Sequence, residues 1–204
     1  MPITNGYVSL AELKAWLTIT VGDTTDDTLL ENACTTASRL VDLYCRRRFY
    51  AATVTSYFTP RDPLSLLTPD LLTVTTLKQD NDGDGVYEEV WTSTDDYLLR
   101  PREAASAVPP GPFWEVSVRP SSSRSFAVGV PDNIEIVGSW GYCATTPEPI
   151  RDATRIQAAR LFRRKDSIFG VAGTGELGQL VMLKGTMDPD ATIILDGYRM
   201  WGSW

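Results

Sequence analysis

The chain has 204 residues, and 43% of them are hydrophobic, which is enough for a packed core and excludes wholesale disorder. Its formal net charge is −7, so its surface is poorly suited to general binding of nucleic-acid phosphates. The first residues lack the basic and apolar blocks of a signal peptide, and no apolar run is as long as a membrane helix. We therefore expect a protein that does not contact a membrane.

Two long amphipathic helices are predicted, over 24–49 and 150–165. The first carries an apolar stripe with spacings of three and four, and the second has a face of small and apolar residues. We expect the second helix to cover the stripe of the first. Thr24 or Thr25 is the expected N-cap of the first helix, and a shorter helix is predicted after the capping box of Ser9 and Glu12. The stripe consists of Leu30, Ala33, Ala37, Leu40 and Tyr44, widened by Leu29, Val41 and Cys45.

Short segments rich in threonine, valine and aromatic residues lie between these helices and predict strands. They indicate a small antiparallel sheet or barrel inserted between the helices. The expected fold class is therefore α+β: an antiparallel helical bundle with an inserted β-sheet or barrel and an extended C-terminal arm. The expected domains are N-terminal bundle helices (1–50), the insertion (51–146), the second main helix (147–168), and a hinge with a docking arm (169–204). The expected strands are Thr53–Phe58, Leu64–Leu67, Thr73–Lys78, Val86–Trp91, Tyr97–Arg100, Trp114–Val118 and Ile134–Trp140.

A stretch of alternating carboxylates resembles the start of a calcium-binding loop. Asp80, Asp82 and Asp84 place oxygen ligands at alternate positions, and Gly85 follows at a turn. The twelfth position is Trp91 where such a loop has glutamate, so the metal site is only a weak candidate. The alternative, which we favour, is a hairpin turn between the two flanking strands, because Asp-Gly pairs favour positive φ.

Two basic clusters and one glycine-rich segment are further candidates. Arg46, Arg47 and Arg48 are expected to close the first long helix. Arg163, Arg164 and Lys165 are expected to close the second. Both clusters have a structural interpretation, in which cations complement the helix dipole, and a functional one, contact with an acidic partner or passing DNA. The segment 170–178 lacks the ending of a phosphate-binding loop, so we interpret it as a hinge.

The last residues are unusually apolar and aromatic. Such segments favour docking on another chain, and the hinge before them would allow the arm to reach away. The alternative is that the arm folds back on its own core. The expected docking residues are Ile193, Ile194, Tyr198, Met200, Trp201 and Trp204.

No catalytic constellation is recognisable. The absence of histidine removes the commonest general base and zinc ligand. The three cysteines form no CxxC motif, which indicates reduced thiols that pack in the core. The carboxylates show no spacing that isolates an acid–base pair. We therefore expect neither an enzyme nor a cofactor.

A series of motifs along nearly the whole chain resembles the tailed-phage head–tail connector (adaptor) proteins of the gp6/gp15-like type. Each motif alone has low specificity, but the whole series in this order is fairly specific. The motifs begin at 8–14, 26–30, 37–42 and 44–49, and continue at 82–88, 140–142, 147–153, 159–164, 169–172 and 183–190.

This resemblance implies a structural protein of the virion neck that is assembled in the host cytoplasm. It implies a homo-oligomeric ring, of twelve subunits in this family, bound under the portal protein by the C-terminal arm. A stopper or tail-completion protein would bind the far face, and DNA would pass through the lumen without specific binding. Two other classes stay open: a soluble calcium-binding β module, and an enzyme that relies on carboxylates.

Overall fold

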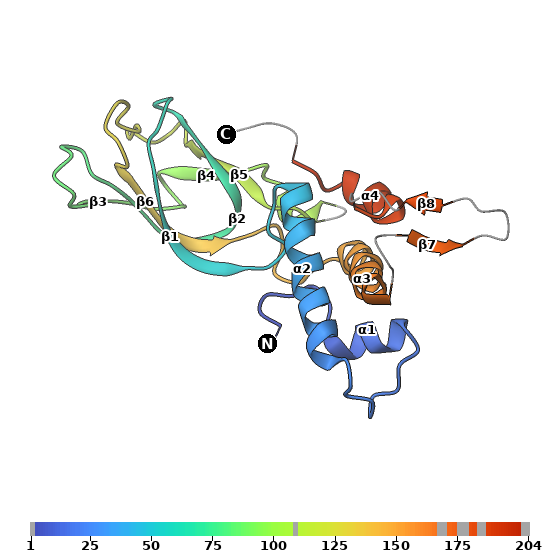
Figure 1. The fold of residues 1–204 in the computed structure, drawn as a ribbon. Helices are drawn as coiled ribbons and strands as arrows, with labels where there is room; N and C mark the ends of the chain where they lie inside the picture. Colours follow the sequence, from blue (N-terminus) through green and yellow to red (C-terminus); the bar gives the residue numbers. More distant parts are fainter. Residues whose placement is uncertain (1–2, 108–109, 167–170, 175–179, 183–186, 201–204) are drawn as a thin grey trace. The chain divides into compact units, whose positions relative to one another are not determined.

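The computed structural model describes residues 3–107, 110–166, 171–174, 180–182 and 187–200. These residues fall into two compact units, each described by itself: a helical unit formed by Met1–Arg46 and Thr146–Met200, and a strand unit formed by Arg47–Thr145. Figure 1 shows the ribbon. The elements are α1 (Leu10–Trp16), α2 (Asp27–Cys45), β1 (Ala52–Phe58), β2 (Ser65–Gln79), β3 (Glu89–Trp91), β4 (Tyr97–Arg100), η1 (Ala104–Ser106), β5 (Phe113–Val118), β6 (Ile134–Trp140), α3 (Glu148–Arg163), η2 (Arg164–Asp166), β7 (Val171–Thr174), β8 (Leu180–Met182) and α4 (Pro189–Asp196).

The helical unit is built on the pairing of α2 with α3, as the stripe of α2 predicted. Leu30, Cys34 and Ala37 of α2 are buried in one cluster with Ala158 and Ala159 of α3. Small side chains on α3 allow the two helices to approach closely, and α1 packs against both of them. The antiparallel helical bundle as a whole stays a prediction, but the contact between α2 and α3 is confirmed.

The ends of the helices follow the sequence only in part. The capping box of Ser9 and Glu12 is present at α1. The N-cap of α2 is Asp26, which makes no side-chain capping bond, so the expected caps Thr24 and Thr25 are wrong. The helix ends at Cys45, and Arg46 follows with φ of 55° in the left-handed region. The prediction that arginines close the last turn of α2 is therefore wrong as well.

The strand unit is one antiparallel sheet in the order β1-β6-β2-β5-β4, with β3 paired to β2. The two segments expected at 64–67 and 73–78 are one long strand, β2, which pairs with β5 through its first half and with β6 through its second. The pairing register shifts between Leu67 and Leu71, around Pro69. Proline cannot donate to a ladder, which explains why the sequence predicted a break at this position.

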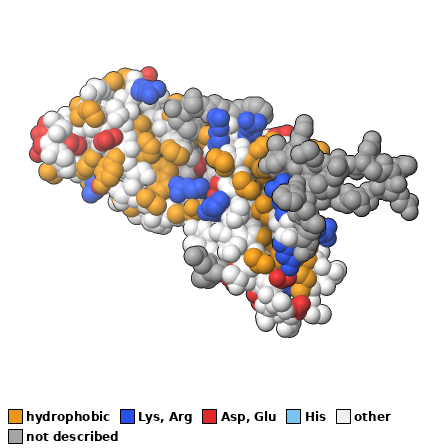
Figure 2. All heavy atoms as spheres, viewed as in Figure 1, with side chains coloured by type: hydrophobic (Ala, Val, Ile, Leu, Met, Phe, Trp, Pro, Cys, Tyr) orange, Lys and Arg blue, Asp and Glu red, His pale blue; other side chains and the backbone are white. Residues whose placement is uncertain are grey.

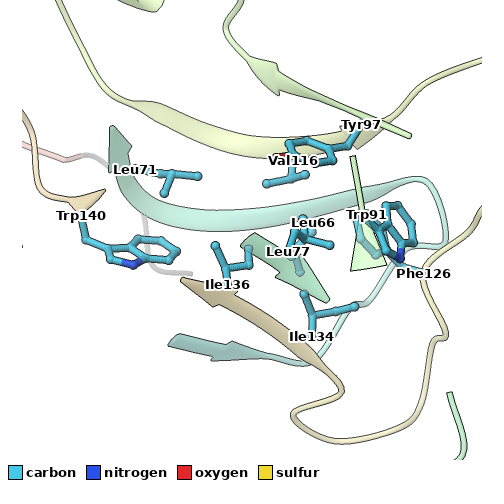
Figure 3. Packing of buried hydrophobic residues seen from close by; sticks show 10 residues of the cluster. All are labelled: Leu66, Leu71, Leu77, Trp91, Tyr97, Val116, Phe126, Ile134, Ile136 and Trp140. Atoms are coloured by element: carbon cyan, nitrogen blue, oxygen red, sulfur yellow. The ribbon is translucent and has the colours of Figure 1, made fainter. Parts of the chain in front are cut away.

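The core of the strand unit lies against one face of this sheet (Figure 3). Trp91 and Phe126 stack with their ring centroids 4.7 Å apart and nearly parallel. Phe126 comes from the connection between β5 and β6 and closes the core, whereas Ser121, Ser123 and Ser125 just before it are exposed. Arg124, two residues before Phe126, forms ion pairs with Glu89 and Asp96 and fixes the connection in place.

The C-terminal segment differs from the expected extended arm. Residues 189–196 form α4, which packs on α3 and α2. Ala191 and Leu195 are fully buried there, and the backbone N–H of Met200 donates to the carbonyl of Cys45. The short helix that Asp188 and Pro189 predict is present as α4. It packs on the other helices, so residues 188–200 do not extend away as the expected arm. β7 lies within the segment 170–178 that was expected to be a hinge, and it pairs with β8, where the sequence predicts a short strand.

Candidate functional site

The loop between β2 and β3 holds the three carboxylates of the calcium candidate. β2 and β3 pair antiparallel on either side of it, which confirms the predicted hairpin. Oxygen atoms of Asp80, Asp82 and Asp84 lie within 4.8 Å of one another, the one such group of three among the described residues. Asp80 is 3% exposed, whereas the other two are exposed. Figure 2 shows acidic side chains gathered at the left end of the strand unit, where Figure 1 draws this loop.

Asp80 organises the loop through its own carboxylate. One of its oxygens accepts the backbone N–H groups of Asp82 and Gly83, and the other accepts that of Gly85. Both glycines have positive φ, of 80° and 88°, which suits a tight turn. Because backbone donors engage both oxygens of Asp80, the contacts support the hairpin interpretation. Calcium binding stays a prediction, which a rise in melting temperature on adding calcium would support.

We predict that Asp80→Asn destabilises the strand unit at neutral pH. Burial raises the pKa of Asp80, but the N–H donors of Gly85, Gly83 and Asp82 outweigh it and hold the pKa below its ordinary value of 3.8. A carboxyl with a lowered pKa stabilises the fold above its ordinary pKa, and this contribution is lost as the pH falls through the folded value. The stability difference between parent and variant should therefore shrink below about pH 4. Urea unfolding across pH measures it, with the exposed Asp95→Asn as control, and a pH-independent difference would contradict the prediction.

The three arginines of the first basic cluster have different surroundings. Arg46, at the end of the helical unit, is exposed. Arg47 is half-buried in the strand unit, 3.4 Å from Asp70 and with its guanidinium 5.2 Å from the ring centre of Tyr142. Arg48 is exposed above Tyr50. Arg47 therefore has a structural role, and only Arg46 and Arg48 present charge to a partner.

Asp70, the partner of Arg47, is 6% exposed and lies in the irregular part of β2. Burial raises the pKa of its carboxyl, and the charges of Arg47 and Arg48 oppose that rise. The backbone carbonyl of Asp70 accepts the N–H of Gly141, which joins β2 to the end of β6. These contacts stabilise the strand unit at the end where its chain enters and leaves.

The second basic cluster lies at the end of α3. Arg163 is exposed in the last turn, where a cation complements the helix dipole as the structural interpretation predicted. Arg164 follows as the C-cap. Lys165 forms an ion pair with Asp26 at the start of α2 and lies 4.4 Å from the ring centre of Phe162. Contact of this cluster with a partner or with DNA stays a prediction.

The predicted docking residues of the C-terminal segment are partly described. Ile193 is 73% exposed on the outer face of α4. Ile194, Tyr198 and Met200 are half-buried, and Trp201 and Trp204 lie outside the described residues. The fold-back alternative holds for α4, whereas Ile193 is available to a partner.

Two of the three thiols are poor nucleophiles. Burial raises the pKa of Cys34 to about 11, and it does the same for Cys143. Both thiols therefore stay protonated near neutral pH.

Within the described part of the chain, no helix has the length and apolar character of a membrane span.

A groove that was missed in the sequence opens in the helical unit between α2 and the end of α3. Its volume is about 190 Å³. Its lining carries no carboxylate, so it offers no acid pair for the carboxylate-based enzyme. One feature of the sequence could have indicated this groove, namely a second apolar row on α2. The lining residues are Leu29, Asn32, Ala33, Thr36, Leu161, Phe162 and Lys165.

Comparison with known proteins gives matches of structure alone. No protein-family model matches the sequence, and no curated protein does. The fold is similar to a chain in the neck of an empty GTA particle reconstructed with C6 symmetry, with a TM-score of 0.64 and 15% identity over 100% of this chain and 95% of that chain. A chain in the neck of a native GTA particle with C12 symmetry matches at 0.58 and 15%, over 100% and 94%. A chain of the native gene transfer agent virion matches at 0.56 and 14%, over 100% and 95%. The α+β fold with its antiparallel sheet is therefore similar, over the full length of the alignment, to that of chains in the neck of these particles.

Proposed function

We propose that this chain is a structural protein of the neck of a virion or virion-like particle, where its copies form the adaptor ring between the head and the tail. The observation that carries the proposal is the match of fold over the entire chain and over 94–95% of two neck chains. A match of this extent includes both the helical unit and the strand unit, so it does not rest on a common small motif. The motif series that resembles head–tail adaptors supports the same role.

The symmetry of the similar assemblies supports a ring. Those necks were reconstructed with C6 and C12 symmetry, and we propose twelve copies of this chain under a portal protein, with a stopper or tail-completion protein on the other side. DNA would pass through the lumen without specific binding. The net charge of −7 favours this role, because a surface that repels phosphates does not retain the passing duplex. The role needs neither catalysis nor a cofactor.

The C-terminal segment is proposed to dock on the portal. α4 anchors the segment on the helical unit, Ile193 faces outward, and Trp201 and Trp204 follow in the sequence. Tryptophan is among the residues that most often dominate interface energies. Twelve such contacts around one ring would bind tightly even where a single contact is weak.

Mass photometry of the purified chain mixed with assembled portal rings from the same genome tests the proposal. We expect the mass of the portal ring to increase until one copy is bound per portal subunit. A mass that stays unchanged at micromolar concentrations of the chain would contradict the portal-binding role. The mass of the chain alone does not decide this proposal, because the proposal concerns binding to the portal.

We predict that the double substitution Trp201→Ala and Trp204→Ala weakens portal binding at least about tenfold, because two large aromatic contacts are lost. Its melting temperature should stay that of the parent. Trp16→Ala is the matched control, since Trp16 lies in α1 and is 49% exposed. Binding isotherms for the three proteins measure the effect, and parent-like binding by the double variant would place the docking contact elsewhere.

A further inference from the structure

The surface of α2 carries a second apolar row beside the buried one. Leu29, Ala33, Thr36, Leu40 and Leu43 follow one another at spacings of four, three, four and three. This is the a/d spacing of a helix that packs along another helix. We call these five residues the α2 seam.

The seam is exposed at Leu29, Thr36 and Leu43, whereas Leu40 is half-buried and Ala33 is 7% exposed at the edge of the buried cluster. The row of Leu30, Ala37 and Val41 is fully buried. Leu29 is 48% exposed and Leu43 is 75% exposed. The prediction that Leu29 widens the internal stripe is therefore wrong. Leu29 and Leu43 lie near opposite ends of α2 on the same row. Exposed leucines in such a row indicate a surface that contacts another protein.

The groove lies beside the N-terminal half of the seam. Leu29, Ala33 and Thr36 form one wall, and Leu161 and Phe162 of α3 form the other. Ala33 is small, so the space between the walls admits an apolar side chain from outside. Such a combination of a row with a hole suits a helix or a ridge of a partner better than a flat sheet edge.

The acidic groups beside the seam are paired within the chain. Lys165, at the groove, is bound to Asp26, and Arg39 lies 3.2 Å from Asp42 beside Leu43. The exposed side chains of the seam itself carry no charge. A partner therefore meets a face whose acidic groups are paired within the chain, with the exposed Arg46 three residues after Leu43, although the chain as a whole has a net charge of −7.

We propose that a second copy of this chain packs against the α2 seam. Two copies that each carry −7 repel wherever their acidic surfaces meet, so they associate where acidic charge is absent or internally paired. The inference deepens the proposed ring, on which it rests, because a ring requires that each copy present one face to the next copy and receive a different one. The seam with its groove is the receiving face.

A photo-crosslinking experiment with two isotopic forms tests the seam. Thr36, which is exposed in the groove wall, is replaced by p-benzoylphenylalanine (Thr36→p-benzoylphenylalanine) in copies of natural isotope content. These copies are mixed with ¹⁵N-labelled parent chain, bound to portal rings and irradiated. We expect cross-linked peptides that join a light copy to a heavy copy. Cross-links confined to one copy, including those to residues 167–186, or cross-links only to the portal, would overturn the proposal.

Charge substitutions give a second test of the same face. Leu29→Glu with Leu43→Glu is expected to reduce the light–heavy cross-link at least about tenfold, because two leucines that the contact would bury are lost and acidic charge is added to the face. Val21→Glu is the matched control, since Val21 is 79% exposed and lies outside the seam. Circular dichroism of both variants checks that they fold like the parent chain. A double variant that cross-links as well as the control would also overturn the proposal.

Failure of the ring and failure of the seam are distinguishable. If copies bind portal rings but no cross-link joins two copies, the seam is wrong and the proposed function stands. If the chain does not bind portal rings, the proposed function fails. The same irradiation of the mixed chain alone at high concentration then decides the seam, with the same two outcomes.

Discussion

Alanine in place of Gly138 is expected to destabilise the strand unit by about 3 kcal/mol or more, the range of severe overpacking. A Cβ atom at this position would lie 2.3 Å from the carbonyl oxygen of Thr73, which belongs to the backbone of the neighbouring strand β2. Gly138 is in β6, which pairs with both β1 and β2. The backbone of β2 cannot retreat without breaking this ladder, so the strain cannot be relieved by a side-chain rotation.

Thermal unfolding followed by far-ultraviolet circular dichroism measures the effect, and the melting temperature should fall by roughly 10 °C. Gly111→Ala is the matched control, because no atom lies within 4 Å of a Cβ atom built at Gly111. Equal melting temperatures for the two variants would show that β2 and β6 do not approach as closely as described.

Leu195→Ala is expected to cost 2–5 kcal/mol and to loosen α4 from the other helices. Leu195 is fully buried, and its carbonyl lies 3.8 Å from Sγ of Cys45 near the end of α2. The substitution leaves a cavity under α4, which is the element that carries the proposed docking segment. Portal binding should therefore weaken together with the loss of stability.

Chemical denaturation and hydrogen exchange of the α4 amides test this prediction. Ile193→Ala is the control for stability, because Ile193 is 73% exposed on the same helix and should cost less than about 0.5 kcal/mol. If both variants have the same unfolding free energy, α4 is not held by its buried face. The same packing implies that deletion of Asp188–Trp204 would not leave the helical unit intact, so substitutions test docking better than truncation.

The helices and most strands could be predicted because their apolar periodicity is local. The stripe of Leu30, Ala33 and Ala37 and the alternation over Ile134–Trp140 each determine one buried face. The end of α2 could not be predicted, because Arg46 adopts a left-handed conformation that nothing in the neighbouring sequence requires. The continuity of β2 was missed for a related reason. Pro69 looks like a break locally, whereas the change of partner from β5 to β6 accommodates it.

The candidate sites divide in the same way. The Asp80 turn was predictable, since its aspartates and glycines interact over five residues. The burial of Arg47 was not, because its partner Asp70 is distant in the sequence. The α2 seam was present in the spacing of the leucines, but one helix can carry two apolar rows, and only the packed structure shows which of them is covered.

The most direct test of the neck role is electron cryo-microscopy of portal rings saturated with this chain. We expect a rotationally symmetric ring on the portal axis, with an open lumen, into which the helical unit and the strand unit fit as described, one copy per portal subunit. Copies bound singly off the axis, or portal rings without added density, would contradict the account.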